Sequence, residues 1–182
     1  NVRVDAAAEL GPRAVTITTG VDSWTASDAF TVMNLLPSDD CDAAAALPPL
    51  TEGTYYSTTV GLTNSLSSGW SCIPWTLNAA DATYALPLLA GQTVRVTATA
   101  PAPADAALVL LATCGDPASA LACADDGFDG DPETLEYTAF EDETIYVVID
   151  GYTLSGFGAV SSSFELIVET PAAPSPIDPP WI

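Results

Sequence analysis

The stretch that decides the fold spans residues 81–169 and contains a series of short apolar or alternating segments. Among them are Leu88-Leu-Ala-Gly91-Gln-Thr-Val-Arg-Val96, Ile145-Tyr-Val-Val-Ile-Asp150 and Phe164-Glu-Leu-Ile-Val168. Segments of this length are typical of β-strands, and Gly, Pro, Asp and Ser residues separate them at nearly even spacing. The pattern predicts an all-β module, an antiparallel and jelly-roll-like β-sandwich.

Length and composition bound the size of that module. A chain of 182 residues suffices for one domain of about 100–150 residues and a smaller piece. Apolar residues make up 48% of the chain, which excludes wholesale disorder. No apolar run approaches the roughly 18 residues that a membrane-crossing helix needs. We therefore expect one full domain and no membrane insertion.

The balance of charge restricts the partners and the chemistry. The formal charge is −21, from 24 acidic side chains and three arginines, and the chain has neither lysine nor histidine. Such a surface repels the phosphate backbone, so nucleic acid is not an expected partner. The usual bases that activate Ser, Thr or Cys nucleophiles are also missing. Among 24 acidic side chains, some pair will have the spacing of glycosidase carboxylates by chance, so such a pair is no evidence of catalysis. We therefore expect that the protein is not an enzyme.

Four cysteines, Cys41, Cys72, Cys114 and Cys123, lack both the C-x-x-C spacing and the histidines of a zinc site. Disulfides are the better interpretation, and they indicate an oxidising compartment, either extracellular or at the cell surface. Cys114 and Cys123 bracket a loop short enough to close locally, which leaves Cys41 with Cys72. The predicted disulfides are therefore Cys41–Cys72 and Cys114–Cys123.

Residues 1–34 form a separate segment, with Leu10-Gly-Pro-Arg-Ala-Val-Thr-Ile-Thr-Thr-Gly20 followed by Ala29-Phe-Thr-Val-Met33. These motifs resemble the closing strands of an immunoglobulin-like domain of the IPT/TIG type. So few strands leave an apolar face and both edges uncovered. We expect a partner to cover them: an upstream segment, a second chain, or the tail ending in Trp181 and Ile182. With no initiating Met or signal peptide, the chain is expected to be a fragment of a longer protein.

Residues 39–170 resemble the bacterial pre-peptidase C-terminal (PPC) domain, whose elements occur here in the family's order. The resemblance implies a β-sandwich that assists secretion, folding or substrate contact without performing chemistry. Residues 171–182 form a Pro-rich tail, expected to be extended polyproline. The residues that carry the resemblance are Cys41, Cys72, Asp81-x-x-Tyr84, Ala90-Gly91-Gln92, Cys114, Cys123-x-x-Asp126, Glu133-x-Leu-x-Tyr137 and Tyr146-x-Val-x-Asp150-Gly-Tyr152.

One acidic loop is a candidate calcium site, because calcium takes about six to eight oxygen ligands that a flexible loop between strands can supply. The EF-hand template fails at Gly127. The alternative is that these residues form turns and add solubility to an already acidic surface. A weaker candidate lies at Asp39, Asp40 and Asp42. The candidate ligands of the loop are Asp125, Asp126, Asp129, Asp131 and Glu133.

Trp70 and Trp75 lie in an irregular segment beside Cys72 and could form a sugar-stacking platform. The alternative is that these aromatic side chains pack in the core or between modules.

The function we expect is that of a non-catalytic extracellular module of a larger bacterial secreted or surface protein, with a structural, adhesive or assembly role. Its partners would be other modules of the parent protein or neighbouring copies. The alternatives are a fibre subunit assembled by β-strand addition and a carbohydrate-binding module that binds a glycan.

Overall fold

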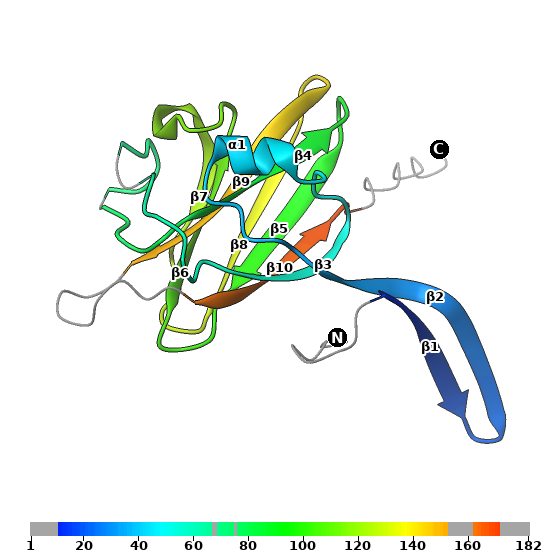
Figure 1. Cartoon of the computed structure of the whole chain (residues 1–182). Coiled ribbons are helices and arrows are strands. Elements are labelled where there is room, and N and C mark those ends of the chain that lie inside the picture. The colour runs from blue at the N-terminus through cyan, green and yellow to red at the C-terminus, as the bar shows by residue number, and fades with distance from the viewer. Residues whose placement is uncertain (1–10, 67–68, 75, 153–161, 172–182) are drawn as a thin grey trace, which may run out of the picture.

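The computed structural model describes residues 11–66, 69–74, 76–152 and 162–171, and side chains are described outside 11–13 and 28–34. In these residues ten strands form two sheets (Figure 1). The six-stranded sheet has the order β1-β2-β3-β10-β5-β8, and the four-stranded sheet has the order β4-β9-β6-β7. The strands are β1 Gly11–Thr19, β2 Asp22–Asn34, β3 Gly53–Thr58, β4 Ala82–Leu88, β5 Thr93–Thr99, β6 Asp105–Leu111, β7 Ala120–Ala124, β8 Pro132–Thr138, β9 Glu143–Tyr152 and β10 Ser163–Glu169.

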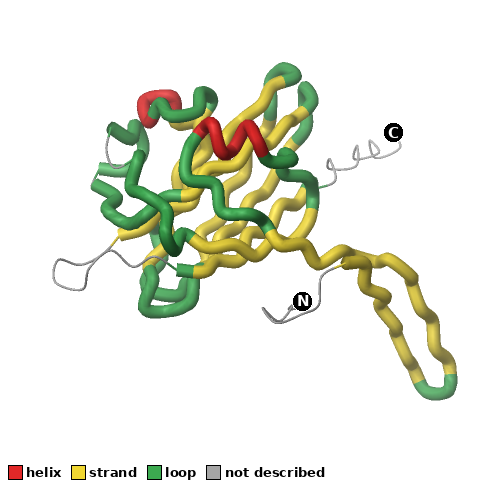
Figure 2. The backbone as a smooth tube through the Cα atoms, in the orientation of Figure 1, coloured by secondary structure: helices red, strands yellow, loops and turns green. Residues whose placement is uncertain are grey.

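All strand pairs of the two sheets are antiparallel except β2 with β3. The predicted all-β antiparallel sandwich is therefore confirmed. Two short helical turns, α1 (Cys41–Ala46) and η1 (Pro117–Ser119), were not predicted (Figure 2). The α1 helix begins because Asp40 caps it, with Asp40 Oδ1 accepting a hydrogen bond from the Ala43 N–H at 2.8 Å.

The core follows from the period-two alternation that predicted the strands. In β5, Val94, Val96 and Ala98 are buried between the sheets, and the residues between them point outward. The β6 strand is buried on both faces. Its Leu108 and Leu110 enter the main core, and its other face enters a second apolar cluster. A further layer must therefore cover the outer face of the four-stranded sheet.

That layer is the irregular segment between β3 and β4, residues 59–81. Leu66, Trp70, Ile73 and Leu77 of this segment pack against the outward-facing side chains of β6 and β9. Trp70 is only 7% exposed, so its ring is not available as an open platform for a sugar. This burial argues against the stacking role expected for Trp70, whereas Trp75 lies outside the described residues.

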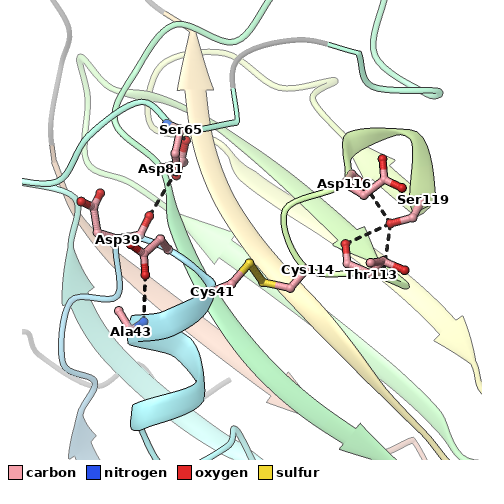
Figure 3. Close-up of a disulfide and its surroundings, with 10 residues drawn as sticks. Asp39, Cys41, Ala43, Ser65, Asp81, Thr113, Cys114, Asp116 and Ser119 are labelled. Carbon is pink, nitrogen blue, oxygen red and sulfur yellow. Dashed lines mark hydrogen bonds between the residues drawn. A yellow bond between two sulfur atoms is a disulfide. The ribbon is translucent and has the colours of Figure 1, made fainter.

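The predicted disulfide pairing is wrong, because Cys41 is bonded to Cys114 and Cys72 to Cys123. In the β6–β7 pair Leu111 lies opposite Ala120, and Cys123 lies three residues further along β7, about 10 Å away. Cys114 extends in the other direction, into the turn after β6. The Cα atoms of Cys114 and Cys123 are therefore further apart than the roughly 7 Å that a disulfide can span. Figure 3 shows Cys114 meeting Cys41 at the start of α1 instead.

The β1–β2 hairpin extends away from the sandwich as an arm (Figure 1). Its link to the body is a parallel pairing from Val32↔Thr54 to Asn34↔Tyr56. Ile17 faces Trp24 across the hairpin, and these side chains are 58% and 62% exposed. The prediction that this segment leaves an apolar face uncovered is met for the described part of the hairpin. The tail proposed to cover it lies outside the described residues.

Candidate functional site

The acidic loop between β7 and β8 is held by its own carboxylates. Glu133 is buried, and its Oε1 accepts a hydrogen bond from the Gly127 N–H at 2.6 Å. Its Oε2 accepts from the Asp126 N–H at 3.3 Å, and Asp131 Oδ2 accepts from the Phe128 N–H at 3.2 Å. Two of the five candidate calcium ligands therefore bind the loop backbone. Among the described residues, no group of three or more Asp, Glu, Cys or His side chains is arranged to hold a metal ion.

The remaining part of the loop forms a pocket of about 530 Å³ with the ends of β6 and β9. Aromatic side chains contribute part of its wall, since Phe128 is 78% exposed and Tyr152 is 37% exposed. The pocket combines carboxylates and aromatic rings, and its described lining residues include no basic one. Its lining residues are Asp105, Asp125, Asp126, Gly127, Phe128 and Tyr152.

Asp105, which the sequence analysis did not single out, is an acid of this pocket whose pKa is raised. Its Oδ1 is buried and has no hydrogen-bond partner among the described residues. Burial raises the pKa of the Asp105 carboxyl to about 6, and the charges of Asp125, Asp129, Glu133 and Asp131 act in the same direction. The loop therefore concentrates negative charge around the Asp105 carboxylate.

Asp150 is a second buried acid, at the end of the apolar run of β9. It is 4% exposed, its Oδ1 accepts from the Gly151 N–H at 2.6 Å, and its Oδ2 has no partner in the described part of the chain. Asp150 and Asp105 both line a second cavity of about 20 Å³, roughly the size of one water molecule. Burial raises the pKa of the Asp150 carboxyl to about 8, and the charges of Asp81 and Asp125 also raise it.

The close approach of β6 and β9 explains why Asp105 and Asp150 share a cavity. In this pair Asp105 lies opposite Tyr152 and Ala107 lies opposite Asp150, so the two carboxylates are diagonal neighbours on one face. Gly151 permits this approach, because a Cβ atom there would lie 2.5 Å from the Asp105 carbonyl oxygen.

The weaker calcium candidate, at the start of α1, is also occupied by structural contacts. Asp39 Oδ1 accepts hydrogen bonds from the N–H of Thr63 at 2.6 Å and from its hydroxyl at 3.1 Å. Nearby, the fully buried Asp81 accepts from the Ser65 N–H, the Ser65 hydroxyl and the Leu66 N–H, each at 2.7 Å. Asp39 thus fastens the irregular segment to the residues before α1, and Asp81 joins the end of the segment to Ser65 near its middle (Figure 3).

A signal for the missed acids was present in the sequence. Asp105 comes directly before six apolar residues of β6, and Asp150 directly follows five residues that begin with Ile145. A carboxylate next to an apolar run indicates a charged group at the end of a buried strand. The sequence could not show that these two strand ends lie together beside the loop that holds Asp125.

No protein-family model matches the chain, and no curated protein shows a significant match. Among solved structures, the pre-peptidase C-terminal domain of a collagenase from Bacillus anthracis is similar at 9% identity and a TM-score of 0.43, covering 77% of this chain and 96% of that one. PliG from Aeromonas hydrophila, a periplasmic inhibitor of g-type lysozyme, is similar at 14% identity and a TM-score of 0.41, covering 75% and 95%. The first is a domain of the family that residues 39–170 resemble. The IPT/TIG resemblance stays a prediction.

Proposed function

We propose that the chain is a non-catalytic, extracellular or cell-surface module of a larger secreted protein, and that its β1–β2 hairpin contacts another module of that protein. The observation that carries this proposal is the exposed apolar face of the hairpin. Ile17 and Trp24 are adjacent across the two strands, and both are more than half exposed. Contiguous exposed apolar surface of this kind is typical of an interaction site.

The composition and the disulfides support the non-catalytic and extracellular parts of the proposal. Without His or Lys, the chain lacks the residues that most often act as catalytic bases near neutral pH. All four cysteines are paired, which is typical of proteins outside the reducing cytoplasm. No helix in the described part of the chain is long and apolar enough to cross a membrane.

The opposite face of the hairpin differs in chemistry. The Thr16 and Thr25 hydroxyl oxygens lie 2.8 Å apart, and those of Thr18 and Ser23 lie 3.3 Å apart. Hydroxyl pairs of this kind satisfy one another and remain compatible with water. The hairpin is therefore two-sided, and we assign the docking role to the face that carries Trp24.

A photo-crosslinking amino acid at position 24 of the full-length parent protein tests this proposal. We expect crosslinks from position 24 to a neighbouring module of the same chain. The matched control is position 140, because Phe140 is an exposed aromatic residue, 91% accessible, in the β8–β9 turn of the body. Equal crosslinking from both positions, or none from position 24, would contradict the proposed docking face.

A second candidate, a fibre subunit, is favoured by the position of β1 at the end of the six-stranded sheet. Among the described residues β1 pairs with β2 alone, so an edge strand of nine residues can offer its outer backbone groups to a strand from another copy. The measurements are made in roughly 0.5–1 M salt, which screens the net charge. Crosslinks between two differently tagged copies, together with light scattering that grows with protein concentration, would favour the fibre. A concentration-independent monomer would exclude it.

A further inference from the structure

We propose that β8 is the edge that accepts β1 of a second copy of this chain, so that the six-stranded sheet continues from one molecule into the next. This inference rests on the second candidate function, the fibre, and adds the surface at which each copy receives its neighbour. A head-to-tail contact joins two unlike surfaces of the same chain. The edge of β1 is one of these surfaces, and the edge of β8 is the other.

The two strands lie at opposite ends of the six-stranded sheet. Among the described residues β8 pairs with β5 alone, in a register that runs without a bulge from Thr93↔Thr138 to Thr99↔Pro132. A regular edge of this kind directs backbone N–H and C=O groups outward, where another strand can bind them. Pro132 stands at the first position of β8, so the residues after it keep their N–H groups. β8 can therefore accept a strand along most of its length.

The charges of the two edges are complementary. β1 contains Arg13 and no acidic residue, whereas β8 contains Glu133 and Glu136 and no basic residue. The Glu136 side chain is 52% exposed. Of the ten described strands, only β1 and β5 contain a basic residue, and β5 already lies inside the sheet. Because each copy carries a net charge of −21, β1 is the strand that can approach the acidic edge of another copy with the least repulsion.

The contact between β8 and β5 shows which side chains β8 pairs with. Arg95 of β5 donates from Nε to Glu136 Oε1 at 2.8 Å. Thr97 of β5 lies opposite Thr134, with their hydroxyl oxygens 2.9 Å apart. Opposite charges and paired hydroxyls are cross-strand contacts that stabilise a sheet.

β1 offers the same types of residue as β5. Its Arg13 is followed by Thr16 and Thr18, which alternate with apolar neighbours. On β8, Thr134, Glu136 and Thr138 alternate in the same way and are exposed. A strand with arginine and alternating threonines therefore suits the outer edge of β8 as β5 suits the inner edge.

Other pairings of the free edges are less favourable. Joining β8 to β8 would bring the glutamates of two copies together, and like charges across a strand pair are destabilising. Joining β1 to β1 would form a two-fold contact that uses the same surface on both copies, so it would not extend into a fibre. The pairing of β1 with β8 combines opposite charges with a contact that propagates.

Photo-crosslinking between two isotopically distinguishable copies of the intact, oxidised chain tests the pairing. The measurement is made in roughly 0.5 M salt, which screens the net repulsion. A photoreactive amino acid replaces Thr134, which is exposed on β8. We expect crosslinks between copies from position 134 to residues 11–19. The matched control is position 54 in β3, an inner strand of the same sheet, which should give no crosslinks between copies.

Charge variants test the contribution of Arg13. Arg13→Glu should weaken the association of copies about three- to thirty-fold, because it replaces an opposite charge at the β8 edge by a like charge. Ala45→Glu and Ala46→Glu together make the same change in net charge at exposed positions of α1 and should leave association unchanged. Thr134→Lys in the accepting copy should restore binding of the Arg13→Glu copy. An unperturbed amide spectrum checks the folding of each variant.

The outcomes separate this inference from the functions on which it rests. Copies that associate but give crosslinks between two β1 strands, or equal crosslinks from positions 134 and 54, would overturn the β1–β8 pairing and leave the fibre standing. An equal loss of association in the Arg13 and the Ala45–Ala46 variants would show that net charge, and not the β8 edge, controls assembly. A concentration-independent monomer would overturn both the fibre and the pairing, whereas the docking of the Trp24 face would still be decided by crosslinks from position 24.

Discussion

Cys72 of the irregular segment is bonded to Cys123 of β7, with their Cα atoms 5.9 Å apart. This bond fastens the segment onto the outer face of the four-stranded sheet, where Cys123 packs against the second apolar cluster. Cys41 and Cys114 make the corresponding link between α1 and the turn after β6, with Cα atoms 5.8 Å apart. Each disulfide thus joins an irregular or helical element to the β6–β7 hairpin.

Replacing Cys72 and Cys123 together by Ser should lower the free energy of unfolding by about 4 kcal/mol. The reason is chain entropy, because the bond closes a loop with a sequence separation of 51 residues. Urea denaturation of the oxidised protein measures the change. Peptide mapping without reduction should show Cys41 linked to Cys114, and a Cys41–Cys72 peptide would contradict the structure.

Asp81→Ala should lower the free energy of unfolding by about 2–5 kcal/mol. The change leaves the N–H groups of Ser65 and Leu66 without the buried acceptor that now binds both at 2.7 Å. Asp81→Asn should cost less, since one acceptor oxygen remains. Glu141→Ala, at an exposed position in the β8–β9 turn, should change stability by less than about 0.5 kcal/mol. A similar cost for Asp81 and Glu141 would contradict the role of Asp81.

The stability of the protein should fall as pH rises from about 4 to about 8. The folded-state pKa of Asp150 is about 8, whereas an unfolded aspartate titrates near pH ~3.9. In that window the folded state holds a proton that the unfolded state has released, so raising pH favours unfolding. Asp150→Asn mimics the neutral carboxyl and should flatten this slope. Thermal unfolding across the pH range tests it, and an unchanged slope would remove Asp150 as the cause.

Amides of the β1–β2 hairpin should exchange with deuterium much faster than those of β9. The hairpin is attached to the body through three parallel residue pairs, whereas β9 is paired along both edges. Trp24→Ala should change the free energy of unfolding by less than about 0.5 kcal/mol, but Leu166→Ala in the core should cost about 2–5 kcal/mol. Protection of the hairpin equal to that of β9 would show that it is covered.

Local patterns predicted strands that the structure contains at β5, β9 and β10, but they did not single out β6 or β7. Val94, Val96 and Ala98 are inward-facing because side chains alternate along any strand, whatever its partner. The same reasoning could not find α1, which is short and is fixed by one cap and one disulfide. It also failed for Trp70, because the sequence does not show which sheet face an irregular segment will cover.

The sequence by itself determined the fold class, the acidic character and the lack of the usual catalytic bases, because periodicity and composition are properties of the chain alone. Only the tertiary structure decided which cysteines pair, because the β6–β7 register separates Cys114 from Cys123. It also decided that Asp105 and Asp150 share a cavity beside the loop of Phe128. These relationships join residues far apart in sequence, and strand pairing sets their distances.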